Sequence, residues 1–217
     1  MSQHTLTLLR FTYKKLKEKL TVSDSKKLFH EKFPYVIPGL YKKIVDEMLV
    51  ELNLLNHQNE FKQDQLFCIG LTETFKELMK GYKPEKHLNI LFESLCDSTN
   101  FEAKEIQETS QKSQEEFKEK STKDLLKFLK EKSSSKPYPS RILNLGIFIL
   151  ISKAQDLVGK NESEINKISS DIFENLNLPF NKAEKDIGIY KSTLSKMEQA
   201  KELIKELNVK NKKKNQN

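Results

Sequence analysis

The residue types that most often carry out chemistry are few in this 217-residue sequence, and they are widely spaced. Cys68 and Cys96 fall on separate predicted helices without the short spacing of zinc ligands, so we expect neither a zinc site nor a disulfide framework. No histidine belongs to a Glu-x-x-His motif, which di-iron sites in helical bundles require. We interpret the four histidines as surface or helix-capping residues: His4, His30, His57 and His87.

The sequence also lacks the motifs of common catalytic and nucleotide-binding sites. It has no G-x-x-x-x-G-K-[ST] loop and no G-x-G-x-x-G turn that could hold phosphate groups. No serine or cysteine lies in a nucleophile-elbow motif. We therefore predict a protein that is not an enzyme and that has no cofactor.

Arginine is rare here although lysine is abundant. Lysine and arginine total 38 residues, and only Arg10 and Arg141 are arginines. Arg141 precedes the most apolar segment of the chain, where a planar donor with two prongs can hold a carboxylate in a way that lysine cannot. We predict that it pairs with a carboxylate of a neighbouring helix, with Asp46 or Glu47 as candidates. The alternative is that Arg141 is an ordinary cation at the start of a helix.

Two glycines lie inside apolar helical segments. The stretches "LFCIGL" at 66–71 and "ILNLGI" at 142–147 share one pattern of apolar residues around Gly70 and Gly146. Glycine inside a helix costs about 1 kcal/mol relative to alanine, so the pattern needs a reason. We hypothesise that the two helices cross closely at these glycines.

The elements that would position these residues are helices. Only six glycines and six prolines occur, and apolar residues follow the i, i+3, i+4, i+7 rule from Tyr41 to Leu55. Gly81 is predicted to end one helix and Pro84 to begin the next. The segment 101–120 has thin apolar content, which favours an exposed helix. We predict an all-α fold: a single helical-bundle domain of about seven to nine helices with a long C-terminal helix.

The chain divides into a body and two basic ends. Residues 1–20 read as a basic amphipathic N-terminal extension, residues 21–208 as the helical domain with an internal linker at 132–139, and residues 209–217 as a basic disordered tail. The net charge is +7, of which each end contributes +4, so the body carries −1. Basic ends suit anionic lipid, RNA or an acidic partner, or serve solubility alone. The longest apolar run, at 145–151, is far shorter than the roughly 20 residues that cross a bilayer.

Five sequence blocks together resemble one known family. The blocks are "TVSDSKKLF", "YKKIVDEMLVELNLL", "LFCIGLTETFKELMKGYKPE", "YPSRILNLGIFILI" and "DIGIYKSTLSKMEQAKELIKE". In this order and spacing they resemble the thylakoid-formation family, also called the photosystem II biogenesis family, of cyanobacteria and plastids. The resemblance covers about residues 21–208.

The resemblance implies a non-catalytic, all-helical protein that supports thylakoid organisation and the biogenesis and repair of photosystem II. It implies as partners the FtsH-type membrane protease, photosystem II assembly components and the thylakoid membrane surface. It also implies a peripheral location on the cytoplasmic face of the cyanobacterial thylakoid. Polar or aromatic residues in the matching blocks are the predicted partner contacts: Asp46, Glu47, Tyr82, Lys83, Arg141 and Tyr190.

Two other functions remain open from the residues. A helical protein could bind nucleic acid or anionic lipid through its basic ends, although no recognition helix or row of stacking aromatics is present. A pigment or cofactor carrier would need an apolar pocket with polar anchors. We expect no specific nucleic acid as a partner.

Overall fold

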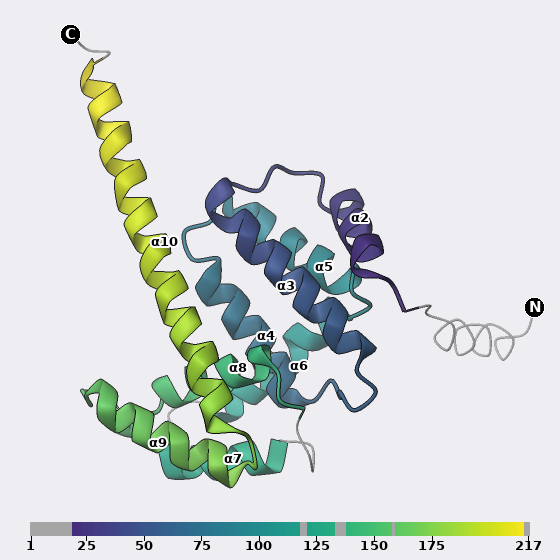
Figure 1. The fold of residues 1–217 in the computed structure, drawn as a ribbon, viewed down its shortest axis with the longest axis vertical. Coiled ribbons are helices and arrows are strands. Elements are labelled where there is room, and N and C mark those ends of the chain that lie inside the picture. Colours follow the sequence, from purple (N-terminus) through teal and green to yellow (C-terminus); the bar gives the residue numbers. More distant parts are fainter. Residues whose placement is uncertain (1–18, 118–120, 133–137, 158, 215–217) are drawn as a thin grey trace, which may run out of the picture.

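A computed structural model describes residues 19–117, 121–132, 138–157 and 159–214, and it is all-helical over these ranges (Figure 1). Nine α-helices and two short 3₁₀ helices lie among the described residues, so the predicted fold class and the long last helix are confirmed. In chain order they are α2 (Val22–Lys32), α3 (Gly39–His57), α4 (Gln65–Leu78), η1 (Glu85–His87), α5 (Leu88–Asp97), α6 (Ala103–Phe117), α7 (Thr122–Lys132), α8 (Arg141–Ser152), η2 (Gln155–Leu157), α9 (Glu162–Asn175) and α10 (Phe180–Lys214).

Side-chain caps set where several helices begin. The Asp64 carboxylate accepts a hydrogen bond from the Phe67 amide at the start of α4, and the Ser140 hydroxyl accepts one from the Leu143 amide at the start of α8. Capping boxes begin α2 at Thr21 and α9 at Asn161. These contacts satisfy amide donors that have no partner within the helix.

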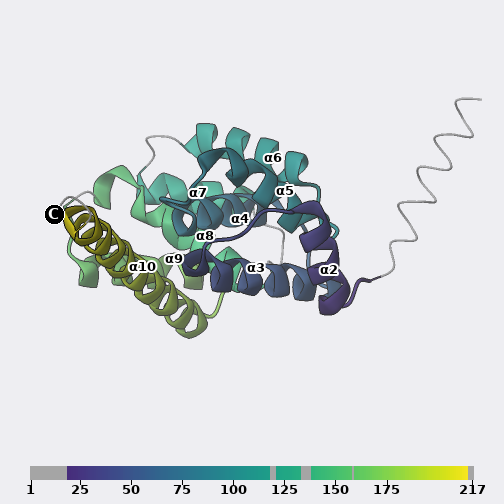
Figure 2. The ribbon, with the colours of Figure 1, turned by 90° about the horizontal axis from the view of Figure 1, so that it is seen from above.

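Helices α4 and α8 form the centre of the molecule. Every residue from Ile142 to Ile151 is buried, as expected for a helix that is apolar on nearly all faces. Seen from above, α3 lies on one side of this central pair and α6 on the other (Figure 2). A Cβ added to Gly146 would lie 2.3 Å from the Gly70 Cα. The close crossing predicted at these two glycines is therefore present.

Helix α6 packs more closely than its composition predicts. We expected an exposed helix here, but Ala103, Ile106, Ser110 and Ser113 are buried on one face of α6. The Ser110 hydroxyl is hydrogen-bonded to the Thr72 hydroxyl of α4. Small residues let two helix backbones approach each other, so this interface is buried without an obvious apolar stripe.

The structure bears differently on the three predicted segments outside the main body of helices. The disordered tail predicted from residue 209 is wrong as far as Lys214, because α10 continues helically to that residue. Lysine has a high helix propensity, so a lysine-rich sequence can continue a helix. In the predicted linker, α7 ends at Lys132 and residues 138–140 are not helical, whereas 133–137 lie outside the described residues. Most of the predicted N-terminal extension, residues 1–18, also lies outside them.

The C-terminal half of α10 extends away from the body. Its first half packs on α8, whereas its last turns stand clear of the other helices (Figure 1). No helix among the described residues combines the length and hydropathy needed to cross a bilayer.

Candidate partner-binding surface

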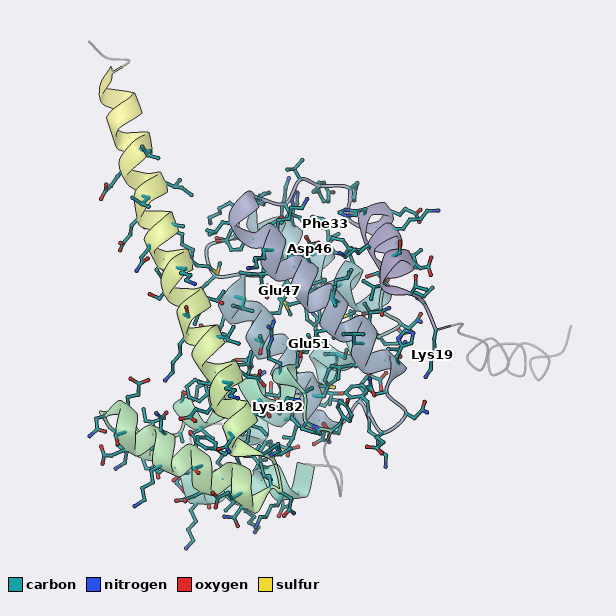
Figure 3. The ribbon with its side chains drawn as sticks, in the orientation of Figure 1. Lys19, Phe33, Asp46, Glu47, Glu51 and Lys182 are labelled. Carbon is teal, nitrogen blue, oxygen red and sulfur yellow. The ribbon has the colours of Figure 1, made fainter. Side chains whose placement is uncertain are left out.

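The outer side of α3 carries two of the six predicted partner residues, Asp46 and Glu47, and also Glu51, which contacts a third, Arg141. Asp46, Glu47 and Glu51 follow one another along α3, and Lys182 lies near the start of α10 (Figure 3). A hollow of about 840 Å³ opens beside α3; its wall includes these four residues and Arg141. We call it the α3 hollow.

A second depression runs between α3 and α10. It has a volume of about 740 Å³, and Lys43 and Glu47 of α3 line both this depression and the α3 hollow. On the α10 side its wall includes Ile189 and Lys196. We call it the α3–α10 groove. The two depressions thus form one surface that is divided by a row of charged side chains.

Arg141 holds the start of α8 to α3 by contacting two carboxylates. Its Nη2 lies 3.7 Å from Glu47 Oε2, and its Nε lies 3.1 Å from Glu51 Oε2 without the alignment of a hydrogen bond. The two glutamates are four residues apart and therefore lie on one face of α3. The predicted pair with Glu47 is present. Among the described residues Asp46 forms no ion pair with Arg141, so that candidate was wrong.

Glu51 is the contact that the sequence analysis missed. Its Oε1 accepts a hydrogen bond from the Ile142 amide at 3.1 Å, in the first turn of α8. Burial raises the pKa of Glu51, and the Arg141 charge and this amide oppose the rise. A carboxylate at a helix N-terminus is favourable because the free amides there carry partial positive charge. The spacing from Glu47 could have identified it.

Helix α10 is joined to the same corner. Asn144 Nδ2 donates a hydrogen bond to Asp186 Oδ2 at 2.8 Å, and Lys182 Nζ donates one to the Pro139 carbonyl at 3.0 Å. These contacts fix α10 beside α8 where the α3 hollow ends. Neither Lys182 nor Asp186 stood out in the sequence, because the approach of α10 to α8 is set by tertiary packing.

Tyr190 lies beneath this surface. It is 7% exposed, and burial together with the nearby Glu77 and Glu73 carboxylates raises the pKa of its phenol above the usual range. The structure therefore places Tyr190 mainly in the core between α10 and the body.

Tyr82 and Lys83 lie elsewhere, at the corner between α4 and α5. Gly81 has a φ of +80°, the left-handed conformation predicted for this helix end. Tyr82 is fully buried, and its ring packs edge-on against Tyr41 with centroids 5.1 Å apart. Lys83 is exposed and pairs with Glu85. Tyr82 also forms part of the wall of a separate hollow of about 870 Å³ between α4, α5 and α6.

The described residues offer little for catalysis or metal binding. They contain no group of three or more His, Cys, Asp or Glu side chains placed to hold a metal ion. Cys68 and Cys96 are buried free thiols, and burial raises the pKa of the Cys68 thiol to about 12. A thiol with so high a pKa is a poor nucleophile at neutral pH.

Comparisons with known proteins agree with one another. The family model described as "Thylakoid formation protein" matches residues 21–217. A Thf1 protein of Prochlorococcus marinus strain MIT 9312 is 77% identical over 92% of this chain and 99% of its own length. Another, of Synechococcus sp. strain CC9605, is 37% identical over 86% of this chain and 87% of its own.

A solved structure, titled as that of Psb29, is also similar. It is 26% identical to this chain, with a TM-score of 0.79, and the match covers 91% of this chain and all of the other. The family that the five sequence blocks predicted is thereby confirmed. This chain belongs to the thylakoid formation protein family.

Proposed function

We propose that this chain is a non-catalytic accessory protein that supports photosystem II biogenesis and repair by binding and maintaining a membrane-anchored FtsH-type protease. It acts peripherally at the cytoplasmic face of the thylakoid membrane, where it also meets photosystem II assembly components. Membership of the thylakoid formation family supports the photosynthetic setting. The protease and the membrane face are our proposal.

The observation that best supports a binding role is the open surface along α3. Two depressions of about 840 and 740 Å³ flank the exposed Lys43 and Glu47, and both are too open and too charged to enclose a small apolar ligand. Surfaces of this kind suit a protein partner, whose charged groups can complement those on the rim. The contact between Arg141 and Glu51 ties the start of α8 to α3 at this surface.

Affinity capture tests the proposal directly. The tagged full-length chain is incubated with cyanobacterial thylakoids that have been solubilised in mild detergent, and bound proteins are identified by mass spectrometry. We expect the FtsH-type protease and photosystem II assembly components to be enriched. A Lys43→Glu bait, whose fold is checked by circular dichroism, should recover less of them, because Lys43 lines both depressions. A Lys104→Glu bait serves as the control, because Lys104 is exposed on α6, away from this surface.

Three outcomes count against the proposal. Failure to enrich both protease and photosystem components contradicts it. Recovery of RNA that disappears steeply as salt is raised favours the nucleic-acid function instead. Visible absorption in the purified protein favours a pigment carrier.

A further inference from the structure

One face of α10 carries an unusual concentration of exposed apolar side chains. Ile189, Leu203, Ile204 and Leu207 are each at least half exposed. Leu207 follows Ile189 by 18 residues, which at 3.6 residues per turn is about five complete turns, so the two side chains project in the same direction. Leu203 and Ile204 fall about 40° and 60° to either side of that direction. These four residues define what we call the α10 face.

The α10 face begins inside a groove and continues beyond it. Ile189 lines the α3–α10 groove together with Leu40 and Ile44 of α3. Leu203 and Leu207 lie further along α10, where the helix stands clear of the body (Figure 1). From Ile189 to Leu207 the face is about 27 Å long, at 1.5 Å per residue. It is therefore longer than the groove and follows a straight line.

The exposed charges on this face are cationic. Lys182, Lys185 and Lys196 fall within about 40° of the Ile189 direction, and all three are exposed. Asp186 lies at the edge of the face, but it is half-buried and accepts a hydrogen bond from Asn144. Across the groove, α3 adds Lys43 and Glu47, which form an ion pair with each other at 3.8 Å.

We propose that the α10 face is the docking site for an amphipathic helix of a protein partner, with acidic residues within and beside its apolar stripe. A straight apolar stripe beside a groove is the shape that a helix fills; about 18 residues of partner helix would cover the stripe, and about 25 residues would also reach Lys182. Carboxylates on that helix would meet Lys182, Lys185 and Lys196. This inference rests on the proposed function, because it names the surface through which the partner binds.

A second copy of this chain is a poorer occupant when the helices run parallel, because the same three lysines would then face one another. An anionic membrane would meet these lysines too. Both occupants are distinguished below by measurement.

The experiment uses the full chain and two probes. One probe is the purified FtsH-type protease in detergent. The other is a synthetic amphipathic helical peptide of about 25 residues with leucine in its stripe and glutamate within and beside the stripe, together with its lysine counterpart. The variants are Leu203→Ser/Leu207→Ser and Lys185→Glu/Lys196→Glu. Val36→Ser is the matched control, because Val36 is 91% exposed and lies on the loop between α2 and α3.

We expect the parent chain to bind the protease and the acidic peptide, and to bind the basic peptide far more weakly. The double serine variant should lose about tenfold or more in affinity for both probes, because an amphipathic helix docks through apolar side chains at helical spacing. The double glutamate variant should lose affinity for the acidic peptide and gain it for the basic one. Val36→Ser should bind like the parent.

Failure of the α10 face as the docking site and failure of the proposed function give different results. Protease binding that neither double variant weakens overturns the α10 face and leaves the proposed function standing. No protease binding, with the acidic peptide still bound through the leucines, contradicts the proposed protease and supports the α10 face. Equal affinity for both peptides overturns the inference that the partner helix is acidic. Two results would assign the α10 face to another occupant and overturn the inference. A dimer in sedimentation that the double serine variant disperses would assign it to a second copy of this chain. Binding to anionic vesicles that this variant abolishes, while its preference for the acidic over the basic peptide stays like that of Val36→Ser, would assign it to lipid.

Discussion

Gly70 and Gly146 occupy the two helix positions at which α4 and α8 leave no room for a side chain. A Cβ at Gly70 would lie 2.6 Å from the Ile142 carbonyl oxygen, and one at Gly146 would lie 2.9 Å from the Gly70 nitrogen. The obstructing atoms are backbone, which cannot rotate away as a side chain can. The spacing of the two helices is therefore set by these residues.

Replacing Gly146 by alanine should lower the free energy of unfolding by about 2 kcal/mol or more, because the central helices must move apart. Urea denaturation measures the change. Gly188→Ala is the matched control, since it also lies within a helix but has no atom within 4 Å of the added Cβ. The control should be stabilised by about 0.5–1 kcal/mol. Similar effects at both positions would contradict a tight crossing.

Glu73 is a buried carboxylate on α4 that is held by two lysines. Only 4% of its side chain is exposed; Lys76 Nζ lies 2.9 Å from Oε1, and Lys153 contacts Oε2. Burial raises the pKa of Glu73, but the hydrogen bonds and charges of Lys153 and Lys76 together lower it further, so that the pKa lies below its usual range. A carboxyl with a lower pKa in the folded chain stabilises the fold above its unfolded pKa.

This stabilisation should disappear in acid. At pH 7 we expect Glu73→Gln to lower the free energy of unfolding by about 1–2 kcal/mol, the scale of hydrogen bonds to a charged group. The difference from the parent should shrink as the pH falls below about 4.3, where the unfolded carboxyl binds its proton, and vanish below the folded pKa. Urea denaturation from pH 7 to pH 3 measures it. A constant difference across this range would exclude the ionic contribution, and Glu108→Gln, in an exposed pair with Lys104 at 3.9 Å, should change little at any pH.

At the scale of helices, the elements that could be predicted are those that the pattern of apolar residues marks. Helices α3, α4 and α10 show apolar residues at helical spacing, and α8 is apolar on nearly all faces, so their existence and the corner at Gly81 could be predicted. Of the two carboxylates that contact Arg141, Glu47 could also be predicted, because it lies on the outer side of α3. Glu51, Lys182 and Asp186 were missed. The four-residue spacing from Glu47 could have identified Glu51. The roles of Lys182 and Asp186 follow from how α10 sits against α8, and no local pattern encodes that arrangement.

Helix α6 was misjudged for a different reason. Three of its four buried positions are Ala103, Ser110 and Ser113, which add little to any hydropathy pattern. Of the four buried residues, only Ile106, which is fully buried, is large and apolar enough to indicate the buried face of α6. Composition therefore predicted solvent exposure where the packing depends on small size.

Ile106→Ala tests whether α6 belongs to the core. We expect the free energy of unfolding to fall by about 2–4 kcal/mol, as for other buried isoleucines that are truncated to alanine. Leu54→Ala is the control, because Leu54 is 52% exposed on α3, and its loss should be below about 1 kcal/mol. Thermal and urea denaturation measure both variants. If the two losses were equally small, α6 would be peripheral, as its composition suggested.

For the molecule as a whole, the feature that matters is where α10 leaves the body. Met197 is 4% exposed, and Lys201 packs its side chain near Gly81 at the corner between α4 and α5. Beyond that point, Leu203 and Leu207 are each more than half exposed. Short helices without tertiary contacts are only marginally stable in water. The end of α10 therefore gains stability mainly when something covers its apolar face.

Hydrogen–deuterium exchange should show this difference along a single helix. In the free monomer, amides at 183–197 should exchange slowly, because Ala183, Ile187 and Met197 anchor them to the body. Amides at 203–207 should exchange at least about a hundredfold faster, since they open without disrupting the core. Binding of the acidic amphipathic peptide should slow the exchange at 203–207 and leave that of α6 unchanged. Equal protection along all of α10 at low protein concentration would contradict this account, because the helix end would then be stable without a partner.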